Sequence, residues 1–255
     1  MEPRPVTPAV ETDSEVARSV ALDAAALLRT LCVAGNCADG DLKRRGDAEA
    51  NTLILDRLRA ARPDDFILSE EAADDRSRCA ASRVWVVDPL DGTREFGERR
   101  EDWAVHIGLA VDGVPVAGAV ALPATHQIFV TDDAPPTFPP LPARPRMVVS
   151  RTRAHEIVQR VAKTLDAELV PMGSAGAKAM AVVEGRAEIY LHAGGQYEWD
   201  NCAPVAVAQA AGLHASRIDG SPLVYNCADP LLPDVLICRP EYVEAVLAAV
   251  AAANP

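Results

Sequence analysis

Residues 84–93, V-W-V-V-D-P-L-D-G-T, constrain the fold more than any other stretch of this chain. Residues 84–87 are β-branched or aromatic without polar alternation, which is typical of a strand buried on both faces. Pro89 cannot donate to a sheet ladder and Gly92 tolerates a sharp turn, so the strand is expected to stop at Pro89. Thr93 is then expected to open a helix.

Two carboxylates, Asp88 and Asp91, flank this bend. Carboxylate oxygens are preferred ligands of hard cations such as Mg²⁺, so the pair can serve a shared metal site. The adjoining backbone amides can receive a phosphate. A short D-P-x-D-G string would also fit an ordinary Asp-Pro turn with a helix cap, and the length of the string favours the site.

Composition narrows the class of protein. The 255 residues, 49% of them hydrophobic, are enough for one large domain or two lobes with a packed core. A net charge of -12 argues against a nucleic-acid polymer or an anionic membrane surface as partner. Six cysteines without a C-x-x-C pair indicate neither a zinc site nor a disulfide framework. No signal sequence and no apolar run of about 20 residues is present, which predicts a cytoplasmic protein.

Helical spacing before the opening motif predicts helices over residues 14–33 and 47–59, separated by a break at 35–40. After the motif, two apolar runs flank Asp112-Gly113, a strong hairpin signal, so at least part of the sheet is antiparallel. His106 lies in the first of these runs and is interpreted as a packed core residue. Residues 135–145 are rich in proline and predict a linker between an N-terminal lobe, 1–134, and a C-terminal lobe, 146–255.

The C-terminal part alternates extended and helical patterns. A loop containing Gly173 and Ser174 precedes a helical stretch, and glycine-rich loops before helices can bind anions, with Lys178 adding a positive charge. Such loops are also ordinary connections. Asp200 is expected to begin and cap an Ala-rich helix over 203–211. A strand at 235–237 and a helix at 243–250 close the chain.

The string W-V-V-D-P-L-D-G-T resembles the signature of the inositol monophosphatase superfamily of metal-dependent, lithium-sensitive phosphatases. Trp199-Asp200 resembles the second family signature, W-D-x-x-[AG], and residues 220–226 resemble its late G-x-P-L-x-Y-N segment. The resemblance covers nearly the whole chain. It implies an α+β fold with the layered αβαβα sugar-phosphatase architecture, two lobes, and mixed, partly antiparallel sheets.

The resemblance also implies a metal site and a catalytic group. Two Mg²⁺ ions, with a third as an option, would be held by Glu70, Asp88, the Leu90 carbonyl, Asp91 and Asp200. Glu70 and Thr93 would orient and deprotonate the attacking water, helped by Asp47. The Val-Thr that precedes this aspartate in the family motif is absent here, and the alternative for Asp47 is an acidic residue favoured by the helix dipole.

A further set of residues is implied to bind the substrate. The amides of Gly92 and Thr93 would cradle the phosphoryl oxygens. Ser150-Arg151 resembles a family S-R pair that contacts phosphate or sugar, and a plain surface arginine is the alternative. The expected substrate-binding residues are Asp91, Gly92, Thr93, Ser150, Arg151, Gly173, Ser174, Lys178 and Glu198.

Branch-specific residues favour the 3'(2'),5'-bisphosphate nucleotidase (CysQ-type) branch. Arg94-Glu95-Phe96 matches its D-G-T-[KR]-E-F form, and Glu198 matches its E-W-D form. The glutamate that inositol monophosphatases carry seven residues before Asp200 would fall at Ala193. The resemblance thus implies hydrolysis of adenosine 3',5'-bisphosphate to AMP and phosphate, with a role in sulfur assimilation.

Three alternatives stay open: an inositol monophosphatase, a broad sugar-phosphate phosphatase, and a silent metal or nucleotide sensor. The intact carboxylates make the sensor the least favoured. The expected partner is a small phosphate ester, and a homodimer is one option for the assembly.

Overall fold

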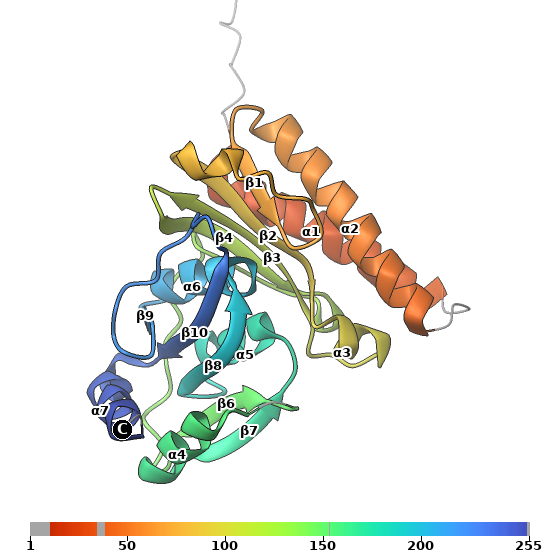
Figure 1. Cartoon of the computed structure of the whole chain (residues 1–255). Coiled ribbons are helices and arrows are strands. Elements are labelled where there is room, and N and C mark those ends of the chain that lie inside the picture. The colour runs from red at the N-terminus through yellow and green to blue at the C-terminus, as the bar shows by residue number, and fades with distance from the viewer. Residues whose placement is uncertain (1–10, 35–38, 153, 254–255) are drawn as a thin grey trace, which may run out of the picture.

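Two five-stranded sheets alternate with three layers of helices (Figure 1). The computed structural model describes residues 11–34, 39–152 and 154–253, and the cysteine at position 37 lies outside them. The layers of helices are formed, in order, by α1 (Asp13–Ala34) with α2 (Asp39–Ala61), by α5 (Ala175–Val183) with α6 (Glu198–Ala210), and by α4 (Glu156–Thr164) with α7 (Val243–Ala253). The αβαβα layering and the α+β class predicted from the sequence are confirmed.

The first sheet takes its strands from the N-terminal half of the chain. Its order is β1 (Phe66–Ser69), β2 (Arg83–Asp91), β3 (Ala104–Val111), β4 (Val114–Leu122) and β5 (Gln127–Val130). Strands β1 and β2 pair in parallel, and the other neighbours are antiparallel. The predicted hairpin joins β3 to β4, with positive φ at Asp112 (49°) and Gly113 (79°), as a tight two-residue turn requires.

The second sheet follows the proline-rich segment. Its order is β7 (Glu168–Met172), β6 (Arg146–Ser150), β8 (Ile189–Tyr197), β10 (Leu231–Cys238) and β9 (His214–Ser216). Strand β6 is parallel to both neighbours, while β8, β10 and β9 are antiparallel. Residues 131–145 contain no helix or strand, as expected of a linker, and one sheet lies on each side of them in sequence. The boundaries of the two lobes stay a prediction.

Short helices complete the fold. They are α3 (Thr93–Gly97) and three 3₁₀ turns, η1 (Ser77–Ala80), η2 (Pro123–Thr125) and η3 (Pro240–Tyr242). Thr93 is the first residue of α3, as predicted. None of the described helices is both long and apolar enough to cross a membrane.

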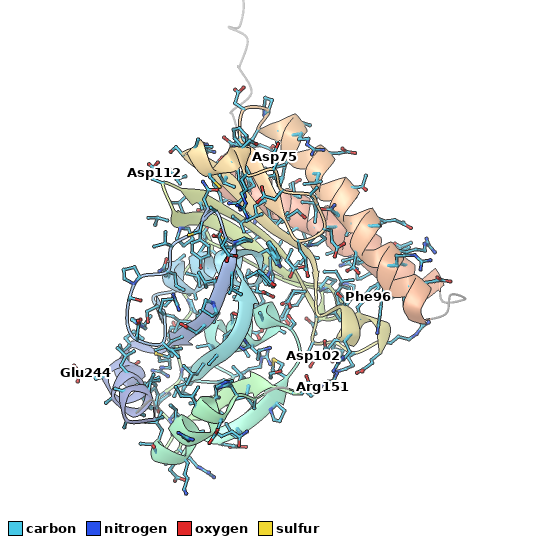
Figure 2. The ribbon with its side chains drawn as sticks, in the orientation of Figure 1. Asp75, Phe96, Asp102, Asp112, Arg151 and Glu244 are labelled. Atoms are coloured by element: carbon cyan, nitrogen blue, oxygen red, sulfur yellow. The ribbon has the colours of Figure 1, made fainter. Side chains whose placement is uncertain are left out.

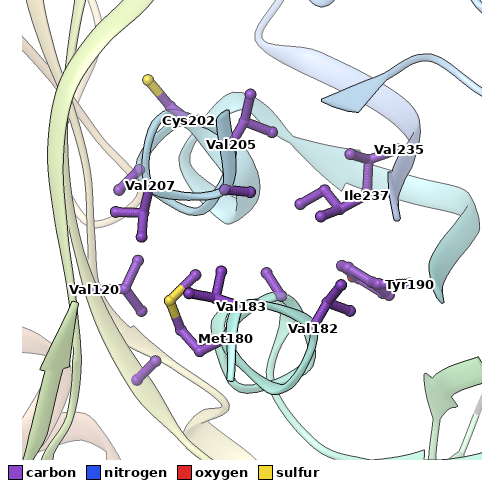
Figure 3. Packing of buried hydrophobic residues seen from close by; sticks show 14 of the residues in the cluster. Val120, Met180, Val182, Val183, Tyr190, Cys202, Val205, Val207, Val235 and Ile237 are labelled. Carbon is purple, nitrogen blue, oxygen red and sulfur yellow. The ribbon is translucent and has the colours of Figure 1, made fainter. Parts of the chain in front are cut away.

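Strand β2 is buried on both faces, as its composition predicted. Val84 and Val86 pack toward α5 and α6, whereas Trp85 and Val87 pack toward α1 and α2. Figure 3 shows the central core, in which residues of the two middle helices meet Val120 of β4 on one side and β10 residues on the other. Because this core contacts both sheets, it fixes the first sheet against α5 and α6, the helices whose first turns reach the acidic site.

Two helices begin earlier than the sequence suggested. Helix α2 starts at Asp39, so Asp47 lies well inside it and Gly40 does not break it. The interpretation of Asp47 as an acid at a helix N-terminus was therefore wrong. Helix α6 starts at Glu198, because β8 continues through Gly194 and Gly195 to Tyr197. Asp200 is consequently the third helical residue rather than the N-cap.

Candidate active site

A β-bulge near the end of β2 aims two carboxylates in the same direction. The strand continues past Pro89, contrary to expectation, and its pairing with β3 slips between Asp88, opposite His106, and Asp91, opposite Ala104. Three residue positions along β2, from Asp88 to Asp91, are thus paired with two along β3, from His106 to Ala104. Since successive residues alternate faces, the extra residue places both aspartates on the face toward α6. Proline is tolerated at a bulge because no ladder hydrogen bond is required there.

A third carboxylate, Asp200 of α6, completes an acidic cluster. One oxygen each from Asp88, Asp91 and Asp200 lies within 4.8 Å of the others. Each residue also accepts a backbone N–H, from Leu90 (2.9 Å), Gly176 (2.7 Å) and Tyr197 (2.7 Å) respectively. The second oxygens of Asp91 and Asp200 accept no hydrogen bond from any described residue, so they are available to a ligand.

The electrostatics of this cluster favour a cation. Burial and the neighbouring carboxylates raise the pKa of Asp88 well above its usual value and that of Asp200 to about 7. Burial would raise the pKa of Asp91 too, but the nearby side chain of His106 and the charge of Lys178 hold it below its usual value. Buried carboxylates in such proximity require protons or a cation. An all-oxygen donor set fits a hard ion such as Mg²⁺.

Glu70 joins the site from the end of β1. Ser69 pairs with Val87 in the parallel β1–β2 ladder, so Glu70 follows the end of β1 at the point where β2 continues into Asp88. Burial and the charges of nearby acids raise the pKa of Glu70 to about 7, although a hydrogen bond with Asp88 opposes the shift. Glu70 thus shares the electrostatic environment of the three aspartates.

Thr93 contacts Asp47 across the gap between α3 and α2. Its hydroxyl lies 3.4 Å from Asp47 Oδ1 and 3.2 Å from the Leu90 carbonyl oxygen, both of which are acceptors. Burial and the charge of Glu71 raise the pKa of Asp47 to about 6. The position of Asp47 inside α2 therefore provides a partner for Thr93. No described hydrogen bond joins Thr93 to Glu70.

The loop before α5 holds the carboxylate of Asp91. Ser174 Oγ and the Gly176 amide both donate to Asp91 Oδ2, and Ser174 Oγ also accepts from the Ala177 amide (3.0 Å) as the helix cap. Lys178 donates to the carbonyls of Gly173 (3.2 Å) and Ser174 from within the protein. The loop that sequence reasoning assigned to the substrate thus also holds a cluster carboxylate in place.

A cavity of about 510 Å³ opens beside the cluster. It brings together ten predicted site residues: Glu70, Asp91, Gly92, Thr93, Ser150, Arg151, Gly173, Ser174, Lys178 and Asp200. Asp47 and Leu90 lie behind this lining and reach it through Thr93, while Asp88 reaches it through the cluster. Gly92 has a φ of 90°, a conformation that favours glycine, so the turn into α3 depends on it.

Arg151 is held at the rim of the cavity by acidic residues of the α3 region. Its Nη2 donates to Glu95 and to Glu98, each at 2.8 Å. Figure 2 labels both Arg151 and Asp102, and the carboxylate of Asp102 accepts from the Gly173 amide at 2.6 Å. Glu95 therefore orients the predicted substrate-binding arginine.

Glu198 does not reach the cavity. It is 1% exposed, and its two oxygens accept from the amides of Asn226 (2.7 Å) and Cys227 (2.8 Å). The expected contact with substrate is therefore replaced by a structural one, which ties the 226–227 segment to the start of α6. The E-W-D string gave no signal for this difference.

The cavity also contains residues that sequence reasoning missed. Arg94, Thr152, His192 and Gln196 line it, and His192 Nε2 is buried without a described hydrogen-bond partner. Burial and the charge of Lys178 lower the pKa of His192 to about 4, so its ring is neutral near pH 7. No motif marked Thr152, His192 and Gln196, and Arg94 was noted only as part of the branch-specific string. Their place in the cavity depends on how β6, β8 and α3 approach one another.

An acidic, oxygen-rich cluster at the edge of a sheet in an αβαβα sandwich is an arrangement that can hold divalent cations. The Inositol monophosphatase family matches residues 9–137 and 143–253, and the chain belongs to this family.

Several characterised proteins are similar to the chain. The 3'-phosphoadenosine 5'-phosphate phosphatase of Mycobacterium tuberculosis is 51% identical over 221 residues, 82% of each chain. The 3'(2'),5'-bisphosphate nucleotidase CysQ of Escherichia coli is 32% identical over 215 residues, 76% of this chain and 84% of its own. The crystal structure of CysQ from Bacteroides thetaiotaomicron, 25% identical, superimposes with a TM-score of 0.78 over 89% of this chain and 97% of its own.

Proposed function

We propose that the chain is a Mg²⁺-dependent phosphomonoesterase that hydrolyses adenosine 3',5'-bisphosphate to AMP and phosphate. The observation that carries this proposal is the 51% identity, over 82% of the chain, to a phosphatase named for that substrate. The residues of the acidic cluster support the metal requirement, because they supply oxygen ligands that repel one another without a cation. A role in sulfur assimilation and a cytoplasmic location belong to the same proposal.

The cation ligands would be Glu70, Asp88, Asp91, Asp200 and the Leu90 carbonyl. When bound, Mg²⁺ would polarise the phosphate and favour deprotonation of the attacking water. The protein fixes Asp88 and Asp91 through the bulge in β2 and Asp200 through the first turn of α6. The number of ions is part of the proposal, with two expected and a third as an option.

Thr93 and Asp47 would activate the attacking water. If the Thr93 hydroxyl donates to Asp47 Oδ1, its oxygen lone pairs are free to accept a proton from a water on the cavity side. Asp47 can hold that proton, because its pKa is raised to about 6. Glu70 was expected to share this role, and its place beside Asp88 favours a role in metal binding instead.

The cavity would also hold the nucleotide. Ser150, Arg151 and Lys178 line it together with His192 and Gln196. Arg151 is already oriented by Glu95 and Glu98, so it can meet a phosphate without first being ordered.

Identification of the products tests this function. The protein is incubated with adenosine 3',5'-bisphosphate in Mg²⁺ or in excess chelator, and the nucleotide products are separated by chromatography. We expect AMP and phosphate in Mg²⁺ and background turnover in chelator, with Asp200→Asn strongly impaired. Adenosine 3'-phosphate as product, or full activity in chelator, would overturn the proposal.

A further inference from the structure

His106 on β3 touches both segments that supply the acidic cluster. Its side chain is fully buried, with Nε2 3.2 Å from Asp91 Oδ2 and Nδ1 3.1 Å from the Trp199 carbonyl oxygen. Asp91 ends β2, and Trp199 precedes Asp200 in the first turn of α6. One imidazole ring thus connects two elements that are more than 100 residues apart in sequence.

The ring also fills the space beneath the start of α5. A Cβ atom at Gly176 would lie 2.1 Å from His106 Nε2, so the helix can approach the ring only because residue 176 is a glycine. The Gly176 amide then donates to Asp91 Oδ2. His106, Ser174 and Gly176 therefore converge on a single carboxylate oxygen.

This convergence determines which way Asp91 points. With Oδ2 surrounded by three groups, Oδ1 is the oxygen left for the cavity, where no described residue donates to it. Rotation of the carboxylate would break all three contacts. On the α6 side, the contact with the Trp199 carbonyl holds the turn from which Asp200 enters the cluster.

We propose that His106 is a positioning residue, which orients the Asp91 carboxylate so that Oδ1 faces the site of a divalent cation. This inference rests on the cation site of the proposed function. Groups behind metal ligands typically change metal affinity or activity by about 10-fold to 100-fold when they are removed. His106 was interpreted from the sequence as a packed core residue, and its burial agrees with that, but its polar contacts give it this additional role.

Three substitutions separate the two contacts of the ring. The side-chain nitrogen of glutamine is as many bonds from Cα as His Nε2, and that of asparagine as many as His Nδ1. His106→Gln can therefore keep the contact with Asp91, His106→Asn can keep the one with Trp199, and His106→Leu keeps neither. Leu109→Ala is the control, because Leu109 lies on the same strand and is fully buried in the core toward α1 and α2.

The readout is direct binding of Mn²⁺, followed by the electron paramagnetic resonance signal of the free ion, with folding checked by thermal melts. We expect His106→Leu and His106→Asn to weaken binding by about 10-fold to 100-fold and His106→Gln by about threefold at most. Leu109→Ala should lower Tm and leave the affinity unchanged. If His106→Leu does not fold, the difference in Mn²⁺ affinity between the glutamine and asparagine variants shows whether His106 positions Asp91.

Two results would overturn the inference. Wild-type affinity in the leucine and asparagine variants, or equal losses in the glutamine and asparagine variants, would show that the ring does not position Asp91. Failure of the wild-type protein to bind Mn²⁺ would overturn the cation site as well. Mn²⁺ binding without nucleotide hydrolysis would instead reject the proposed substrate, and the comparison of variants would still decide the role of His106.

Discussion

Asp88 and Asp91 point to the same face of β2, although they are three positions apart, because the pairing with β3 slips by one residue between them. A regular strand would have sent one of them toward α1 and α2. The bulge therefore creates the acidic pair, and the first turn of α6 adds Asp200 to it.

The stability of the metal-free protein should fall as pH rises toward neutrality. Glu70 and Asp200 have pKa values raised to about 7, against about 4 for carboxyl groups in an unfolded chain. Between these pKa values the folded state binds more protons than the unfolded chain. The stabilisation that these protons provide is complete at low pH and is lost as pH rises through about 7.

A cation replaces those protons, which makes the effect of Mg²⁺ depend on pH. The rise in Tm on adding Mg²⁺ should be larger at about pH 8 than at about pH 5.5. Thermal melts in chelator and in saturating Mg²⁺ measure it, and Asp200→Asn should reduce the rise. The same Mg²⁺ effect at both pH values would contradict the assignment of the ligands.

Thr93→Ala and Asp47→Asn should each lower kcat by about 10² to 10⁴ fold, because each removes one half of the proposed proton acceptor. KM should change much less. The double variant should be scarcely slower than the worse single variant, because the two groups act on one proton. Rates are measured at saturating Mg²⁺, and strictly multiplicative losses would assign the residues to separate steps.

Glu198→Gln should reduce stability and spare catalysis. The carboxylate accepts the partly buried backbone N–H groups of Asn226 and Cys227, and a glutamine amide has only one oxygen to offer them. The unsatisfied donor should cost about 1–3 kcal/mol in the free energy of unfolding. Denaturant unfolding measures this, with kcat/KM expected within about twofold of the wild-type value because Glu198 lies outside the cavity lining. A large rise in KM with unchanged stability would restore the substrate-binding role.

The family resemblance implied the layered fold, whereas local patterns in the sequence predicted single elements of it. The apolar run before Asp88 and the hairpin at Asp112-Gly113 each have a direct physical meaning, and both are confirmed. The proline-rich segment contains no helix or strand, and the division into two lobes stays a prediction. Helix starts were less predictable. Asp47 looked like a helix beginning because the residues before it are mostly polar, yet α2 extends back to Asp39 through them.

Contacts across the site could not be read from local patterns. His106 carries no motif, and its position against Asp91 depends on the register of β3 opposite the bulge. Glu198 matched a family string, but its side chain turns toward the 226–227 segment because α6 begins at that residue. Both outcomes follow from how distant elements pack.

The ratio of kcat/KM for adenosine 3',5'-bisphosphate to that for inositol 1-phosphate, at saturating Mg²⁺, tests the proposed function most directly. Arg151 is oriented by Glu95 of the branch-specific Arg94-Glu95-Phe96 string, and Ala193 leaves no carboxylate at the position where inositol monophosphatases carry a glutamate. We expect a ratio of at least about 10, equivalent to roughly 1.4 kcal/mol of transition-state binding. Equal values, or a preference for inositol 1-phosphate, would contradict the assignment to the nucleotidase branch.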